Sequence, residues 1–193
     1  MANTNNPKGL SPVKFLSGAP WTGQARIYSV AAGDSTALHI GDPVLDAGTS
    51  QTWANGDVTK DVVKAATTDV ITGVVVAVLP DTRDSLIYRA ASTARRVFVA
   101  DSPDLLFEVQ EGTGGTALTA NDLGLNISFA AGTPSTVTGY SGVTIDNGTE
   151  ATTNTLALKL VEFVNRPDNA IGDSAKWLVR INRHRYADQL AGV

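Results

Sequence analysis

Hydrophobic and polar residues alternate along several short stretches of this chain, a pattern typical of β-strands with one buried face. In residues 95–100 the alternation predicts that Arg96 and Phe98 point to one face and that Val97 and Val99 point to the other. Residues 155–164 and 176–183 alternate in the same way. Further runs rich in β-branched and aromatic residues predict strands at 25–30, 43–46, 71–79, 105–111, 126–130 and 140–145.

Turn-forming residues separate these runs, at 46–48, 55–56, 112–115, 146–148 and 167–168. Helix is limited to one short turn, with Thr119 as the expected N-cap and Gly124 as the expected end. Residues 58–66 fit a helix as well as a strand, and residues 80–94 and 131–139 are expected to be surface loops. The sequence therefore predicts an all-β fold with very little helix, a sandwich or barrel of about nine strands.

The first 24 residues differ from the rest of the chain and predict an extended N-terminal arm. They have a polar start and little apolar periodicity, and Pro12 and Pro20 lack the amide hydrogen that a helix needs. An extended arm gains contact area on a neighbouring subunit without enlarging the core. We expect residues 1–24 to extend away from the core or along a partner. Residues 25–193 are expected to form one β domain or two small β subdomains.

Composition favours a folded domain. Hydrophobic residues make up 42% of the 193 residues and charged residues 18%, below the usual charged share of about 25%. The net charge is −4, yet both ends are basic, since residues 1–33 contain no acidic side chain and residues 174–193 contain mostly basic ones. The acidic middle argues against general nucleic-acid binding. The basic ends suit acidic surfaces on a sister subunit or on another protein.

Signals for secretion or membrane insertion are not seen in the sequence. The chain contains no cysteine, which excludes disulfides and thiolate chemistry. No apolar stretch approaches the roughly 18 residues of a membrane span, and no apolar signal segment begins the sequence. We therefore expect no contact with a membrane.

His39 and His184 are the candidates for an imidazole general base. A Ser–His–Asp arrangement needs one of them beside an exposed serine, and the sequence has no G-x-S-x-G motif. The neighbouring Arg183 and Arg185 are expected to lower the pKa of His184 and make it a poorer base. The sequence thus predicts that the protein is not an enzyme.

Metal and cofactor sites are not indicated either. Asp101, Asp104 and Glu108 form a carboxylate cluster, but Asp101 and Asp104 bracket Pro103 as in a tight turn. The glycine-rich run 112–115 lacks the lysine of a phosphate-binding loop and predicts a hairpin turn. We expect no catalytic residue, no required metal and no cofactor.

Several stretches spread over the whole chain carry a family resemblance. They are residues 1–13 (Met-Ala-Asn-Thr-Asn-Asn-Pro-Lys-Gly-Leu-Ser-Pro-Val), 18–24 (Gly-Ala-Pro-Trp-Thr-Gly-Gln), 101–111, 117–121 and 168–179. Together they make the chain similar to head decoration, or cement, proteins of tailed bacteriophages. No catalytic motif defines this group, so the resemblance implies a role and not a site.

The resemblance implies a position on the capsid exterior of a virion. Such a protein contacts several subunits of the major capsid protein and stiffens the shell against internal DNA pressure. We further expect a homo-oligomer, a dimer or a trimer, assembled in the bacterial host cytoplasm without direct contact to nucleic acid. The predicted partner-binding residues are the cations Lys8, Lys14, Arg26, Arg183 and Arg185 and the apolar contacts Phe15, Trp21 and Tyr186.

The tryptophans provide an alternative. Trp21 and Trp53 stand in polar surroundings, where a ring can act as an interface anchor or as a platform for stacking sugars. Either ring can equally pack back onto the domain. Trp177 belongs to a predicted strand and is expected in the core. The alternative function is a carbohydrate-binding or adhesin-like β module on a virion.

Overall fold

The computed structural model describes residues 3–187, and the regular structure there is almost entirely β. Its strands are β1 (Ser11–Phe15), β2 (Arg26–Val30), β3 (Pro43–Thr52), β4 (Val58–Lys64), β5 (Gly73–Val78), β6 (Arg95–Ala100), β7 (Leu105–Gln110), β8 (Asn126–Ile127), β9 (Phe129–Ala130), β10 (Thr144–Ile145), β11 (Leu158–Phe163) and β12 (Lys176–Ile181). Within these residues the helical content is one short 3-10 turn, η1 (Ala120–Asp122), capped by Thr119 as predicted. The predicted all-β class with very little helix is confirmed.

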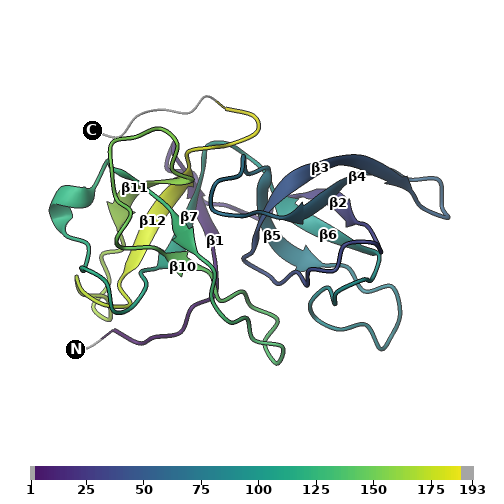
Figure 1. Ribbon diagram of the computed structural model, residues 1–193, viewed down its shortest axis with the longest axis horizontal. Helices are drawn as coiled ribbons and strands as arrows, with labels where there is room; N and C mark the ends of the chain where they lie inside the picture. The colour runs from purple at the N-terminus through teal and green to yellow at the C-terminus, as the bar shows by residue number, and fades with distance from the viewer. Residues whose placement is uncertain (1–2, 188–193) are drawn as a thin grey trace.

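The strands form two lobes that lie side by side (Figure 1). We call β2 to β6 the barrel lobe, because these strands close into a barrel in the order β2-β4-β3-β5-β6. The sheet lobe contains an antiparallel sheet in the order β1-β7-β12-β11-β8, with the pair β10-β9 beside it. The pairing of β1 with β7 therefore joins two segments that the whole barrel lobe separates in sequence.

The barrel lobe has a small core made largely of valines, which suit a pleated and curved sheet. Its buried residues are Tyr28, Val30, Leu38, Val44, Val62, Val75, Val97 and Val99. Val97 and Val99 are fully buried, whereas Arg96 and Phe98 are only partly buried, so the predicted alternation of these four residues is confirmed. Arg89 is fully buried and ties two loops of this lobe together. Its guanidinium donates hydrogen bonds to the backbone carbonyls of Ala31, Asp34, Thr36 and Thr93.

The sheet lobe has a larger core with bulkier side chains. Trp177 is fully buried, as predicted, and its indole N–H donates to the buried carboxylate of Glu111 at 2.9 Å. That carboxylate also accepts from Leu118 N–H at 2.8 Å and from the Asn147 amide at 3.2 Å. Burial raises the pKa of Glu111 above its ordinary value, while the three donors work in the opposite direction.

The two lobes share an apolar contact. The core cluster of the sheet lobe continues into the barrel segment through Ala65, Ile71, Val74 and Ala100. Close by, the backbones of Gly9 and Gly41 touch, and a Cβ on Gly9 would lie 2.4 Å from the Gly41 carbonyl oxygen. Gly9 also has a φ of +70°, a left-handed conformation that favours glycine. Both the close backbone contact and this conformation therefore exclude a side chain at position 9. The lobes are therefore packed directly on each other.

The predicted arm is wrong for the described part of residues 1–24. Ser11–Phe15 form β1 and pair with β7, and Leu10 is buried. The residues before them also lie on the sheet lobe, because Asn3 makes three hydrogen bonds with the loop at 170–173. The free edge of β7 accepts this segment as a strand, and weak local periodicity gives no sign of such a distant partner.

Two local predictions also differ from the structure. Residues 46–48 do not end a strand but form a bulge inside β3, where Gly48 has a φ of +77° and the register shifts between Asp46 and Ser50. Residues 58–66, which fit either state, are mostly strand β4. The bulge lets β3 continue beyond residue 46, so β3 and β4 form the long ribbon at the far end of the barrel lobe (Figure 1).

Candidate partner-binding surface

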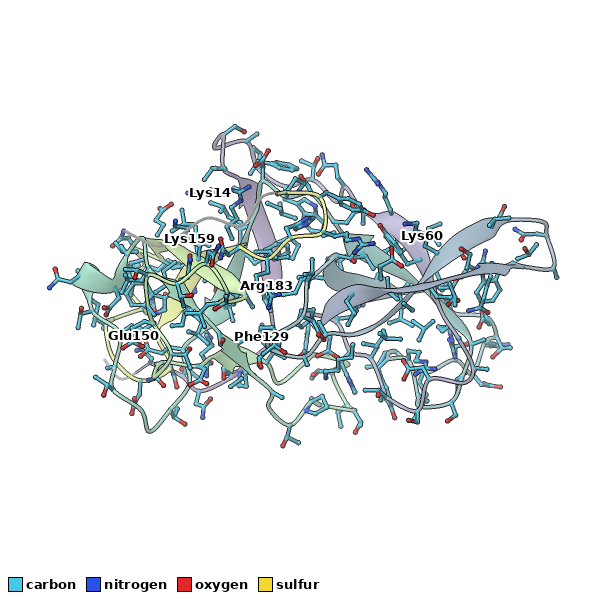
Figure 2. All side chains as sticks on the ribbon, turned by 45° about the horizontal axis from the view of Figure 1, so that its top comes forward. Lys14, Lys60, Phe129, Glu150, Lys159 and Arg183 are labelled. Carbon is cyan, nitrogen blue, oxygen red and sulfur yellow. The ribbon has the colours of Figure 1, made fainter. Side chains whose placement is uncertain are left out.

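A short hairpin projects from the sheet lobe directly after β1, seen above the Lys14 label in Figure 2. The Phe15 N–H donates to the Ala19 carbonyl at 2.8 Å, and the Gly18 N–H returns to the Phe15 carbonyl at 2.8 Å. Gly18 adopts a φ of +90°, which the tight turn requires. The turn leaves the Leu16 side chain 51% exposed at the tip.

Two adjoining hollows, of about 660 Å³ and about 440 Å³, lie against this hairpin and share Phe15 and Ser102 in their walls. Arg26 and Tyr186 border the larger hollow, and Leu16 borders the smaller one. Phe15, Arg26 and Tyr186, which the sequence predicted separately as partner-binding residues, are therefore neighbours on one surface. Leu16 was not predicted. We call Phe15, Leu16, Arg26 and Tyr186 the hairpin patch.

A hydrogen-bonded network forms the floor of the larger hollow. The Tyr28 hydroxyl donates to Asp101 Oδ2 at 2.8 Å, and Arg26 Nε lies 3.5 Å from the same oxygen. The Tyr186 hydroxyl lies 3.5 Å from that of Tyr28. Burial, followed by the hydrogen bonds to Tyr186 and Asp101, raises the pKa of Tyr28, which therefore stays a neutral donor. The network holds the guanidinium of Arg26 at its Nε, and the Arg26 side chain remains 71% exposed.

The hairpin patch combines two kinds of contact in one place. Exposed apolar side chains next to hollows and inside a polar rim are typical of protein–protein interfaces. The planar guanidinium of Arg26 can meet a carboxylate with two parallel hydrogen bonds. The patch therefore suits a partner segment that carries an apolar side chain close to an acidic one.

Lys14 and Trp21 belong to the same hairpin but have structural partners of their own. Lys14 Nζ lies 2.7 Å from Glu162 Oε2. Trp21 is half-buried against the core of the sheet lobe, and its indole N–H donates to the Gln24 carbonyl at 3.0 Å. Of the two placements expected for Trp21, the structure shows the ring packed back onto the domain, where it holds the hairpin on the sheet.

The remaining predicted cations do not border the two hollows of the hairpin patch. Arg183 stands near the centre of the molecule (Figure 2) and donates to the carbonyls of Thr68 and Thr155, one from each lobe. Arg185 is exposed. Lys8 is exposed elsewhere on the sheet lobe, with its ammonium 5.6 Å from the centre of the Tyr140 ring. The basic ends of the chain therefore do not form one continuous surface.

One face of the Trp53 ring is covered, and its indole nitrogen is hydrogen-bonded within the barrel lobe. Its indole N–H donates to Ser29 Oγ at 3.0 Å and Thr59 Oγ1 at 2.9 Å. The guanidinium of Arg96 covers the ring at 5.0 Å from its centre. Trp53 belongs to the barrel lobe and Trp21 to the sheet lobe, so the two rings do not form one platform. This geometry does not favour the carbohydrate-binding alternative.

A buried cluster of Ser141, Asp42 and His39 is formed by residues too far apart in sequence to be anticipated. The Ser141 hydroxyl donates to Asp42 Oδ1 at 2.5 Å across 99 positions of the chain. Lys64 Nζ lies 3.0 Å from the same oxygen, whereas His39 Nδ1 is 3.9 Å from Asp42 Oδ2. Because the serine bonds to the carboxylate and not to the imidazole, the cluster does not follow the order of a nucleophilic triad.

His184 lies at the contact between the lobes and is almost completely buried. Burial lowers its pKa to about 4. The cation that adds to this effect is Arg180, so the expected cause, the sequence neighbours Arg183 and Arg185, is wrong. The ring accepts a hydrogen bond from the Tyr186 N–H at 3.1 Å and thereby helps to position one side of the hairpin patch.

The carboxylates that clustered in sequence are divided among separate partners. Asp104 lies 3.4 Å from Arg180, and Glu108 receives two hydrogen bonds from Arg166. Residues 3–187 contain no group of three or more His, Asp and Glu side chains placed to hold a metal ion. In the same part of the chain, no helix is long and apolar enough to cross a membrane.

Comparisons with protein-family models, curated proteins and solved structures gave no match. The function must therefore be inferred from the residues of this chain. The hairpin patch is the surface at which predicted partner-binding residues and open hollows coincide.

Proposed function

We propose that the protein is a decoration protein of a tailed-bacteriophage head, which attaches to the outside of the major capsid protein shell and stabilises it. The family resemblance of the sequence supplies the role. The hairpin patch carries the proposal of binding, because it exposes Leu16 and Tyr186 beside two hollows and holds Arg26 ready for a carboxylate. In this role the protein acts on the virion exterior as a homo-oligomer and does not touch the packaged nucleic acid.

The architecture supports a mechanical role, in which the protein stiffens the shell. A closed barrel has no free strand edges, and an antiparallel sheet with a bulky core resists distortion because its interior is close-packed. The two lobes also share apolar contacts through Ile71 and Val74. Force applied at the hairpin patch therefore passes into a body with two directly packed lobes.

The hairpin patch also indicates the chemistry of the capsid segment that it would bind. Leu16 and Phe15 fit an apolar side chain, and Arg26 fits an aspartate or glutamate next to it. Exposed ion pairs contribute little to affinity and act mainly on the rate of association. Attachment should therefore weaken only modestly with added salt, because the apolar contacts persist.

Co-sedimentation with undecorated capsids of the cognate phage tests the proposal. Leu16→Asp should weaken attachment at least about tenfold, because it places a charge at the centre of an apolar contact. Val137→Asp is the matched control, since Val137 is 86% exposed on a loop that does not border the patch. That variant should bind as the unchanged protein does.

The two possible failures have different meanings. If the unchanged protein does not bind capsids, the decoration role is wrong. If it binds and Leu16→Asp binds equally well, the role stands but the hairpin patch is not the contact. Unfolding curves of both variants show whether the substitution has altered the fold itself.

A further inference from the structure

A separate hollow of about 450 Å³ lies on the sheet lobe, away from the hairpin patch. We call it the polar pocket. One wall is the segment at residues 4–11, the second is the outward face of β7 and β12, and the third is the loop that follows β11. Its charged and amide side chains are Lys8, Glu108, Gln110, Arg166, Asp168 and Lys176.

The wall formed by the N-terminal segment is fastened in place by amide side chains. Gln110 accepts a hydrogen bond from the Asn6 N–H at 2.8 Å and donates one to the Asn5 side chain at 2.8 Å. Asn3 is bonded at three points to the loop at 170–173. These contacts fix residues 3–6 on the sheet lobe and thereby position this wall of the pocket. The Asn3 and Asn5 side chains take part, whereas Asn6 contributes its backbone N–H.

The carboxylates of the pocket are already paired with one guanidinium. Arg166 donates to both oxygens of Glu108, at 2.9 and 3.1 Å, and its Nε lies 3.4 Å from Asp168. This bidentate geometry is the strong form of an arginine–carboxylate pair. The negative charge of the pocket is therefore largely committed to Arg166.

The two ammonium groups of the pocket are left without such a partner. Among the described residues, no carboxylate lies within 4.0 Å of Lys8 Nζ or Lys176 Nζ. Lys176 uses one of its three N–H donors on Gln110, at 3.0 Å. Burial lowers the pKa of Lys176, and the charges of Arg166 and Lys8 add to that effect, whereas those of Glu108 and Asp168 oppose it. Lys8 also lines the hollow, and its ammonium lies 5.6 Å from the centre of the Tyr140 ring. Two lysines with available N–H donors therefore border the same hollow.

We propose that the polar pocket binds one anionic oxygen group, a phosphate or a carboxylate, between Lys8 and Lys176. Such a group accepts the remaining ammonium N–H donors and reduces the repulsion between the two cations. The hydroxyls of Thr4 and Ser11 border the same hollow and can donate further hydrogen bonds. The anionic group comes either from a free small anion or from an acidic side chain of a bound protein. The proposal of this site does not depend on the proposed decoration function.

Nuclear magnetic resonance of the full chain tests the pocket directly. The backbone amide of Asn6 and the side-chain amide of Gln110 lie in the pocket wall and report on its occupation. The probes are inorganic phosphate and N-acetylaspartate, the second standing for an acidic side chain, each compared with sodium chloride at the same ionic strength. We expect saturable shifts with at least one probe, and the preferred probe identifies the source of the anion.

Charge-removing variants provide the control. Lys176→Gln and Lys8→Gln should each weaken binding about tenfold or more, as expected for the loss of a hydrogen bond from a charged donor. Lys60→Gln removes one charge from the barrel lobe (Figure 2) and should leave binding unchanged. Shifts that match those in sodium chloride, or equal losses in all three variants, would show that the pocket is only a polar surface. Unfolding curves establish that each variant is folded.

Discussion

The two lobes achieve stability by different means. The sheet lobe buries bulky side chains such as Trp177 and Phe107, and its loops are held by amide side chains such as Asn169, which makes three hydrogen bonds with nearby backbone. The barrel lobe buries mainly valines. It closes its strands on one another, and its loops are held by one buried guanidinium, that of Arg89.

The difference follows from the strand edges. A barrel pairs each strand on both sides, so its backbone polar groups are satisfied with little apolar bulk. An open sheet leaves two edges, and this one recruits β1 at one edge and uses a deep core beneath its face. We therefore expect the sheet lobe to be most sensitive to lost volume and the barrel lobe to lost hydrogen-bond donors.

The largest effect should come from Trp177→Ala in the sheet lobe. It removes a fully buried indole and leaves Glu111 without one of its donors, which together should lower the free energy of unfolding by about 5 kcal/mol. Urea unfolding followed by nuclear magnetic resonance at the Trp53 indole N–H reports on the barrel lobe in the same sample, because this group bonds to Ser29 and Thr59. Because the lobes share an apolar cluster, Trp53 should show the lowered midpoint too.

A Trp53 midpoint that stays unchanged would mean that the lobes unfold independently. Trp177→Phe keeps most of the side-chain volume and should lower the free energy of unfolding less than Trp177→Ala does. It replaces the alanine variant in this measurement if that variant does not fold. A larger loss in Trp177→Phe than in Trp177→Ala would contradict the importance of volume in this core.

The second-largest loss of unfolding free energy should come from Arg89→Met in the barrel lobe. It removes four hydrogen bonds to backbone carbonyls and the charge that lies 3.6 Å from Asp34, and we expect a loss of unfolding free energy of about 3 kcal/mol. Hydrogen exchange should speed up at the Ser92 amide, which bonds to the carbonyl of Asp34 in the tied loop. Arg83→Met, an exposed change in the same loop, should stay within about 0.5 kcal/mol. Equal losses in both would contradict the role of the buried guanidinium.

A smaller effect should appear at the contact between the lobes, where His184 responds to pH. Its folded pKa of about 4 lies below the ordinary 6.5, so the unfolded chain takes up a proton before the folded protein does. The stability that this neutral ring contributes is complete above pH 6.5 and is lost as the pH falls toward 4. Between pH 7 and pH 5 the loss should be about 2 kcal/mol.

His184→Gln should remove most of that pH dependence, measured as the difference between urea-unfolding free energies at the two pH values. If the variant loses as much stability as the unchanged protein, other groups determine the acid sensitivity. His39→Gln is the comparison in the barrel segment, where burial likewise lowers the pKa of the ring.

The smallest effect should come from Lys14→Gln. Lys14 and Glu162 pair at 2.7 Å on a partly exposed surface of the sheet lobe. Such pairs are screened by solvent and salt, so the loss of unfolding free energy should be below about 0.5 kcal/mol and should vanish at high salt. A loss that persists at high salt would show that the lysine stem packs on the sheet.

Much of the fold could be predicted because its strands alternate strongly. In residues 95–100 and 176–181, the order of hydrophobic and polar side chains indicates which positions are buried. Strand β1 escaped prediction because its partner β7 lies on the other side of the barrel lobe in sequence, and no local pattern records that pairing. The bulge at Gly48 resembled a turn because both need the same positive φ.

The candidate surface was predictable by residue type but not by position. Phe15, Arg26 and Tyr186 are two aromatic residues and one cation near the two ends of the chain. Only the fold shows that they border one hollow. Leu16 gave no signal, since exposure at a hairpin tip is a property of the turn. The partners of Trp21 and Gln110 depend in the same way on residues that three-dimensional packing brings together.

The barrel lobe also interrupts the sheet lobe along the chain, and its first and last strands are neighbours, with Arg26 opposite Val99. On the ribosome, residues 26–100 would leave the exit tunnel before β7 does, so the barrel can close early. Strand β1 and its hairpin would wait unpaired throughout that time. A nascent chain would thus expose the hairpin before the lobe that holds it exists, and the arrival of β7 would fix β1 in its sheet.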